Sequence, residues 1–390
     1  MKKKQKFRSG PVKQFLEFLL ANDYHAKRVT SMADATLGVL QANALGIHAI
    51  GHGLAYARGL ADKHAIKQVD RLMSNAGIEP WDMFDLWVPA MVGERKEIMV
   101  VLDWSDFDVD DQTTLMLSLT TRHGRATPLV WRTVLKSELK GQRQQHEAQV
   151  VSKFLDALPD GIRVTLLADR GFDDHKFMDF LHTLCGFDYV IRFRGNTNVK
   201  SAEGEVRMAK DWVGKGGRAK MLKNAKITKK GYEVATVVCM QDKKMKEPWC
   251  LASSRSKDDA KAFAKWYSKR WSIETSFRDL KDPMFGMGLG RVRVKRCDRR
   301  DRLIMIAAFA IVLMTLLGAA GESLGFDRFL KANTTKKRTH SLLRQGYMWY
   351  NHIPNMPEER LRPLMREFTP LLQKIRGLNN HVLYSSRAAG

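Results

Sequence analysis

The segment WYSKRWSIETSFRDLK, residues 266–281, carries side chains whose types and spacing suit chemistry on a phosphate group. Its pattern predicts a single helix from Trp266 to Lys281. At about 100° per residue, four functional side chains then share one face: Tyr267, Arg270, Glu274 and Lys281. A carboxylate beside two cations and a phenol can hold a metal ion next to a phosphate. The segment therefore indicates an enzyme that acts on a nucleic-acid backbone.

The other faces of this helix are predicted from polarity alone. An apolar stripe is expected to pack against a core: Trp266, Ile273, Phe277 and Leu280. The remaining face is expected to meet solvent: Ser268, Ser272, Thr275, Ser276 and Asp279. Two tryptophans adjacent to candidate functional residues, Trp104 and Trp271, are interpreted as packing residues.

Two aspartates end apolar strand patterns elsewhere in the chain. Asp103 follows IMVVL, and Asp169 follows VTLLA. Reactive groups of open sheets gather at the carboxyl ends of strands, so Asp103, Asp169 and Glu274 can converge in space. Three carboxylates suit Mg²⁺, with Mn²⁺ as a substitute, and leave positions for water and phosphate oxygens. Such a site activates a water or a 3′-hydroxyl for in-line displacement. Taken alone, an Asp after an apolar strand is more often a turn or capping residue.

Hydrophobic periodicity predicts the elements that must position these acids. Strands are expected at 98–104, 113–121 and 126–134, then a helix at 142–158, a strand at 164–169, a helix at 175–184 and a strand at 188–194. This order predicts an α/β fold, a ribonuclease-H-like mixed sheet with helices on both faces.

Four regions are predicted around this core. Residues 1–95 are expected to form a helical DNA-binding domain, 96–194 and 250–321 the catalytic core, 195–249 a basic β-rich insertion, and 322–390 a helical C-terminal region. Within the first region Lys63, Lys67 and Arg71 recur every four residues. That spacing makes either a solvated basic face or a DNA-contacting helix.

Composition favours a polyanionic partner. The 390 residues include 66 Lys and Arg against 42 Asp and Glu, a formal net charge of +24, which draws the chain to nucleic acid or, alternatively, to a membrane surface. Four cysteines without paired short spacing disfavour a zinc module or a disulfide framework and fit a reducing cytoplasm. The uncharged run 303–321 is nearly long enough to span a bilayer, but a buried core helix has the same pattern and is the interpretation adopted here.

The acids and their flanking residues resemble the DDE transposases of the bacterial insertion-sequence-four family. The resemblance is carried by VVLDWSDFD around Asp103, by LLADRGF around Asp169, and by YSKRWSIETSFRDLK followed by MFGMGLG. The spacing of the family's Tyr-Arg-Glu-Lys signature matches four residues: Tyr267, Arg270, Glu274 and Lys281. The likeness extends from about residue 97 through the 303–321 segment and covers both ends only loosely.

The resemblance implies cut-and-paste transposition of double-stranded DNA, Mg²⁺ dependence, and a homodimer that pairs two transposon ends. One active site would nick an end, close a DNA hairpin, reopen it and join the freed 3′-hydroxyl to target DNA. Asp103, Asp169 and Glu274 would bind the metal. The other signature residues would hold phosphates, a task for which the guanidinium fork is suited: Tyr267, Arg270 and Lys281.

Hairpin closure also needs an aromatic surface for a base that leaves the stack. Trp249 matches the family position that supplies it, and a buried core tryptophan is the alternative. Arg192 and Arg194, at the end of the 188–194 strand, either contact the flipped strand or belong to a simple edge strand.

Two other functions stay open: a ribonuclease-H-like nuclease that cuts without joining, and a non-catalytic DNA-binding relative. The second would have lost an acid, and all three acids are present. We expect a cytoplasmic protein that associates with DNA and not with a membrane.

Overall fold

The computed structural model describes residues 9–21, 23–243 and 245–387. Five helices precede the first strand: α1 (Ser9–Leu20), α2 (Ala26–Ala42), α3 (Ile47–Arg58), α4 (Asp62–Met73) and α5 (Pro80–Val92). Proline fits at the start of α5 because the first helical N–H has no intrahelical partner. In α4 the apolar side, including Val69 and Leu72, is buried, while Lys63, Lys67 and Arg71 are exposed.

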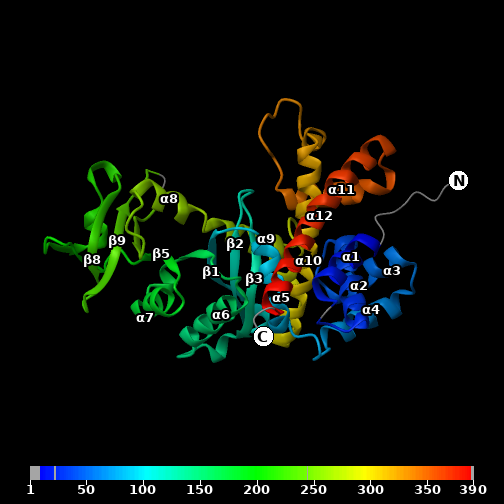
Figure 1. The fold of residues 1–390 in the computed structure, drawn as a ribbon, viewed down its shortest axis with the longest axis horizontal. Helices are drawn as coiled ribbons and strands as arrows, with labels where there is room; N and C mark the ends of the chain where they lie inside the picture. Colours follow the sequence, from blue (N-terminus) through cyan, green and yellow to red (C-terminus); the bar gives the residue numbers. More distant parts are fainter. Residues whose placement is uncertain (1–8, 22, 244, 388–390) are drawn as a thin grey trace.

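The described part of the chain contains a sheet of ten strands in the order β3-β2-β1-β4-β5-β10-β9-β8-β6-β7. Its first half comprises β1 (Glu97–Phe107), β2 (Gln112–Thr120), β3 (Ala126–Leu135), β4 (Arg163–Ala168) and β5 (Asp188–Phe193). Strand β4 lies parallel to both β1 and β5, whereas β2 lies antiparallel to β1 and β3. The predicted α/β class is thus confirmed: this is a mixed, ribonuclease-H-like sheet flanked by helices (Figure 1).

The remaining strands extend the same sheet on the far side of β5. They are β6 (Asn198–Lys200), β7 (Val206–Met208), β8 (Lys220–Ile227), β9 (Tyr232–Met240) and β10 (Trp249–Ser253). Strand β10 pairs antiparallel with β5 and with β9, so it joins the two halves. Figure 1 shows β8 and β9 at the end of the molecule farthest from α1–α4. The β-rich insertion therefore continues the core sheet instead of forming a separate one.

Two helices connect the strands of the first half. Helix α6 (Arg143–Ala157) lies between β3 and β4 in the chain and contacts β2 and β3. The helix expected at 175–184 is a short α7 (His175–Asp179) that continues as a π-helical turn over Phe180–Leu184.

The segment 266–281 is two helices, so the prediction of a single helix was wrong. Helix α8 (Ala260–Ser268) ends before Lys269, and α9 (Trp271–Lys281) begins after Arg270. Lys269 and Arg270 keep right-handed helical dihedral angles, but their N–H groups bond to the carbonyls three residues back, Trp266 and Tyr267. The tighter turn interrupts the α-helical hydrogen bonds and places Arg270 at the junction.

The expectation of a solvent-facing side on this segment was also wrong for three residues. Ser272, Ser276 and Asp279 are buried. Ser276 accepts a hydrogen bond from the backbone N–H of Ala126 and donates one to its carbonyl, and Asp279 pairs with Arg125 at 2.5 Å. These polar side chains bind the first residue of β3 and the residue before it, which explains why a face without apolar residues packs inside.

The uncharged run lies in α10 (Cys297–Ser323), which contacts β3, α2 and α11 (Leu342–His352). It is the one helix in the described ranges that is long and apolar enough to cross a membrane, and 78% of its apolar window is buried inside the fold. Figure 1 shows α10 between the sheet and the N-terminal helices, with α12 (Glu358–Arg387) running beside it. The burial supports the core-helix interpretation.

Helices α10 and α11 approach closely through two glycines. A Cβ on Gly318 would lie 1.9 Å from the carbonyl oxygen of Leu342, and one on Gly346 would lie 1.8 Å from that of Met314. Only glycine allows this backbone contact. The crossing fixes the C-terminal helices against the core.

Candidate active site

Asp103 and Asp169 lie side by side where the parallel pairing of β1 with β4 ends. The register pairs Leu102 of β1 with Ala168 of β4, and each aspartate is the next residue. Asp103 lies within β1 and pairs with Met116 of β2. This arrangement follows directly from the parallel pairing, because equivalent strand ends meet at one edge of a sheet.

Arg270 links Asp103 to Glu274. Its guanidinium lies 3.4 Å from Oδ2 of Asp103 through Nη1 and 2.5 Å from Oε1 of Glu274 through Nη2. The side chain of Arg270 is only 7% exposed, so these contacts form away from water. A guanidinium thus sits between two carboxylates that belong to different elements.

Tyr267 joins the third acid to the same cluster. Its hydroxyl donates a 3.0 Å hydrogen bond to Oδ1 of Asp169. The ring of Trp249 packs edge-on against Tyr267, with centroids 4.9 Å apart and planes at 77°. Trp249 is the first residue of β10 and is half-buried. The structure therefore brings Asp103, Asp169, Glu274 and three of the predicted DNA-contacting residues into one cluster: Tyr267, Arg270 and Trp249.

Burial controls the charges in this cluster. It raises the pKa of Asp103 to about 6, although the Arg270 charge and the Trp104 N–H act against it, and the nearby charges of Asp169 and Glu274 raise it further. Arg270 does not offset the burial because it is shared with Glu274. Burial also raises the pKa of Tyr267, and the Asp169 charge adds to the effect, so its hydroxyl remains protonated and donates.

Arg192 lies near the end of β5 and Arg194 directly follows that strand, and the two side chains make different contacts. Arg192 lies 3.9 Å from Oδ1 of Asp169 and binds Glu247 at 2.9 Å. Arg194 is 67% exposed and lies 4.0 Å from Asp173. Arg192 thus borders the cluster directly, and Arg194 stands further out.

Lys281 reaches β1 beyond Asp103. Its Nζ donates to Oγ of Ser105 at 3.2 Å and to the carbonyl of Asp106 at 2.5 Å, and it lies 4.8 Å from the centre of the Phe107 ring. Partial burial lowers the pKa of Lys281, an effect that the neighbouring Asp106 charge counteracts. Lys281 contacts Ser105, Asp106 and Phe107 of β1, so it lies beside the carboxylate cluster and not inside it.

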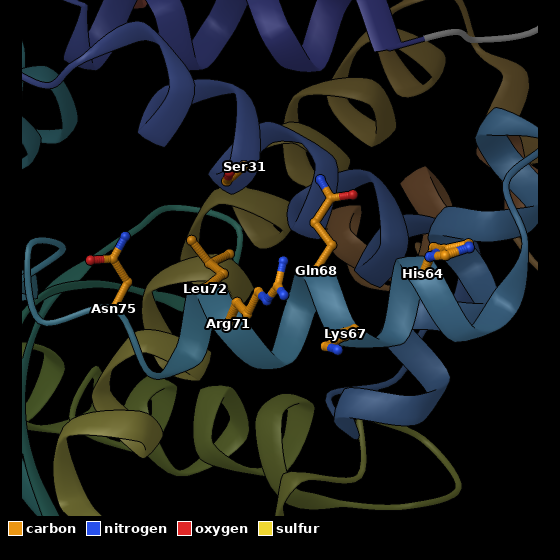
Figure 2. Close-up of a pocket in the computed structure, with 7 residues that line it drawn as sticks. All are labelled: Ser31, His64, Lys67, Gln68, Arg71, Leu72 and Asn75. Carbon is orange, nitrogen blue, oxygen red and sulfur yellow. The ribbon is translucent and has the colours of Figure 1, made fainter.

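The basic stripe of α4 lies apart from this cluster. Lys67 and Arg71 line an open cavity of about 560 Å³, together with residues of α4, α2 and the following loop: Ser31, His64, Gln68, Leu72 and Asn75 (Figure 2). Lys63 is exposed and is not among the lining residues. Figure 1 shows α4 on the other side of α10 from β1 and β5.

Glu147 and Arg143, which lie near the acids, were not identified from the sequence. Beneath Asp103, Trp104 donates from Nε1 to the buried Glu147 at 2.9 Å, and Glu147 also accepts from Arg143 at 3.1 Å. These contacts support the packing interpretation of Trp104. Trp271 is 53% exposed under the Arg270 guanidinium, so its interpretation as a packing residue was wrong.

Arg170 and Glu247 were missed as well. Arg170 follows Asp169 directly and binds Glu247 at 2.9 Å. The LLADRGF motif contains Arg170, but no pattern links it to a glutamate in a distant loop.

The donor types fit a divalent hard cation, since carboxylate oxygens are the ligands that Mg²⁺ and Mn²⁺ prefer. Asp103 and Asp169 are adjacent, and Glu274 is linked to Asp103 through Arg270. Within the described ranges, no three Asp, Glu, His or Cys side chains are arranged to hold a metal ion together. For Glu274 to join the two aspartates at a cation, the Arg270 bridge has to open.

A ribonuclease-H-like sheet with paired acids at its strand ends is the architecture of enzymes that act on nucleic-acid backbones. Residues 131–313 match the family model described as a transposase DDE domain, and this match supports a DDE transposase, a class that acts on DNA and generally uses divalent metal ions. The matched range includes Asp169, Tyr267, Arg270 and Glu274 and begins after Asp103. No curated protein matches the chain.

Proposed function

We propose that this protein catalyses cut-and-paste DNA transposition, through metal-dependent cleavage, hairpin formation and strand transfer at transposon ends. The observation that carries the proposal is that Arg270 contacts both Asp103 and Glu274 while Asp169 follows the residue paired beside Asp103, within a chain that matches the DDE domain over residues 131–313. The spacing of the insertion-sequence-four signature supports the hairpin-forming group.

In this mechanism Asp103, Asp169 and Glu274 hold Mg²⁺, and Mn²⁺ substitutes for it. A divalent ion held by these three residues would activate the attacking water or 3′-hydroxyl and stabilise the leaving oxygen. Arg270 exchanges its carboxylate contacts for phosphate oxygens of the cleaved strand, which its planar fork binds bidentately. The protonated Tyr267 hydroxyl orients Asp169 and remains available to a phosphate.

Trp249 receives the base that leaves the stack when the hairpin closes. It already packs against Tyr267, so one face of the site is an aromatic wall beside Asp169. Stacking of one base contributes about 1–3 kcal/mol. Arg192 and Lys281 border the same cluster, Arg194 stands further out, and all three hold flanking phosphates.

The rest of the chain binds and pairs the DNA ends. Residues 1–95 form the end-binding domain, in which Lys63, Lys67 and Arg71 of α4 contact phosphates. Residues 96–194 and 250–321 form the catalytic core, 195–249 the basic insertion and 322–390 the C-terminal region. A homodimer pairs two ends in the cytoplasm.

A cleavage assay on DNA that carries the repeats flanking the gene tests the proposal. Wild type with Mg²⁺ should give hairpin and joined products on a denaturing gel, and Glu274→Ala should bind the ends without cutting them. Nicks without hairpin or joined products would replace the proposal by a ribonuclease-H-like nuclease. End binding by wild type without any cleavage would indicate a non-catalytic relative.

A further inference from the structure

Glu247 occupies a site built for an anion at the edge of the acidic cluster. One oxygen of its carboxylate, Oε2, lies 2.9 Å from Nη1 of Arg170 and 2.9 Å from Nη2 of Arg192. A single anionic oxygen therefore bridges two guanidinium groups that come from different strand ends. A phosphate oxygen has the same charge preference and accepts the same hydrogen bonds.

These contacts are poor candidates for a purely structural role. Glu247 and Arg170 are 57% and 51% exposed, and ion pairs in water stabilise a fold only weakly. Arg192 is only 17% exposed, and its buried Nε has no hydrogen-bond partner among the described residues. The largely buried Arg192 and the exposed Arg170 thus bind the exposed Glu247, and a more strongly charged anion can displace Glu247 from them.

The position of this anion site relates it to the proposed chemistry. Arg192 also lies 3.9 Å from Oδ1 of Asp169, and Arg170 is the next residue after Asp169. Glu247 stands two residues before Trp249, in the segment that joins β9 to β10. An anion held by the two arginines is therefore beside both the carboxylates and the aromatic wall.

We propose that Glu247 is an intramolecular substitute for a DNA phosphate, and that a backbone phosphate displaces it from Arg170 and Arg192 when DNA enters the site. The inference rests on the proposed function and adds to it an anion-binding site for which Glu247 competes with DNA phosphate. In the free protein Glu247 neutralises the two arginines and disfavours DNA at the site. Its displacement also frees the segment next to Trp249.

The test compares the binding of a short DNA duplex of arbitrary sequence by fluorescence anisotropy, in EDTA and at several salt concentrations. Glu247→Gln removes the competing charge and should bind about 3- to 10-fold more tightly than wild type, since exposed ion pairs are weak but repulsion of phosphate is also removed. Glu205→Gln is the matched control, because Glu205 pairs with the half-exposed Arg207 in the same basic insertion. It should tighten binding by less than about 2-fold.

A double-mutant cycle separates a local site from a general gain in positive charge. Arg170→Gln should weaken binding by less than about 2-fold when Glu247 is present, and by about 3- to 10-fold in the Glu247→Gln background. The same change in the Glu205→Gln background should behave as it does in wild type.

Two outcomes would overturn the inference in distinguishable ways. If wild type binds DNA and Glu247→Gln is no tighter than Glu205→Gln, or the cycle shows no coupling, the phosphate substitute is refuted while the proposed function stands. If wild type shows no salt-dependent DNA binding, both are refuted together. Equal far-ultraviolet circular dichroism of all variants establishes that none of these differences comes from misfolding.

Discussion

Replacing Asp103 by Asn should stabilise the protein at neutral pH while removing a metal ligand. The folded-state pKa of Asp103, about 6, lies above its ordinary value of 3.8, because burial penalises the charged form. The folded state therefore binds the proton more tightly than the unfolded chain, and stability is lost as pH rises from about 3.8 through about 6. Above pH 6 the buried charge of Asp103 lowers the stability of the folded state, and a neutral Asn at this position does not.

The size of the effect follows from the same values. A rise from 3.8 to about 6 corresponds to about 3 kcal/mol, at about 1.4 kcal/mol for each pKa unit. With an unfolding entropy of about 2.1 cal/mol/K per residue over 390 residues, the variant should unfold about 4 °C higher at pH 8 if the chain unfolds cooperatively. Near pH 4 the difference should vanish, because wild-type Asp103 is then protonated in the folded state.

The assay is thermal unfolding in EDTA at pH 4 and pH 8, with Asp106→Asn as the matched control. Asp106 lies three residues along β1 and is exposed. Burial opposes its charge, but the Thr113 and Lys136 side chains and the positive charges of Lys136 and Lys281 together outweigh that effect and lower the pKa of Asp106. Replacement of Asp106 by Asn should therefore lower stability at pH 8. An Asp103→Asn variant that unfolds at a lower temperature than wild type at pH 8 would refute the electrostatic reasoning. A variant that still unfolds at a higher temperature than wild type at pH 4 would refute it as well.

Three further predictions concern the same cluster and the core. Arg270→Gln leaves Asp103 and Glu274 without their shared cation and should lower the free energy of unfolding in EDTA by about 3 kcal/mol. Mg²⁺ should restore more stability to this variant than it adds to wild type, and equal Mg²⁺ responses in thermal unfolding would contradict the prediction. Trp249→Ala should slow hairpin closure more than first nicking in a time-resolved gel assay, whereas equal slowing would point to lost packing on Tyr267. Gly346→Ala should destabilise the α10–α11 crossing by about 3 kcal/mol in denaturant unfolding, and an unchanged midpoint would contradict the close approach to Met314.

The order of strands along the chain could be predicted from local patterns, and the convergence of Asp103 and Asp169 was expected from the fold class that this order indicates. Apolar runs mark the strands, and the parallel pairing of β1 with β4 then brings their ends together. The prediction placed Tyr267, Arg270 and Glu274 on one helix face, and all three do reach the site, although across a helix break. The break itself has no strong sequence signal, since Lys269 and Arg270 retain helical dihedral angles.

The remaining features depend on partners that are distant in the sequence. Ser276 and Asp279 are buried because the start of β3 offers backbone groups and Arg125, which a polarity count along one helix cannot reveal. Glu247 lies in an irregular segment, and only the folded sheet brings it to Arg170 and Arg192. Pattern analysis finds residues that repeat along an element, and it misses contacts made by single residues across the fold.

The free site balances its charges internally on both sides of Asp169. On one side Arg270 takes the position of a cation between Asp103 and Glu274, and on the other Glu247 takes the position of an anion between two arginines. Each internal partner has the charge sign of a ligand that the proposed reaction requires: a divalent metal for the carboxylates and a phosphate for the arginines. In the proposed mechanism a DNA phosphate would release Glu247, a bound metal would free Arg270 for a phosphate oxygen, and a phosphate that takes Arg270 would leave Asp103 and Glu274 to the metal. The two ligands should therefore favour each other's binding, because each breaks the contacts between Arg270 and the carboxylates that the other must displace.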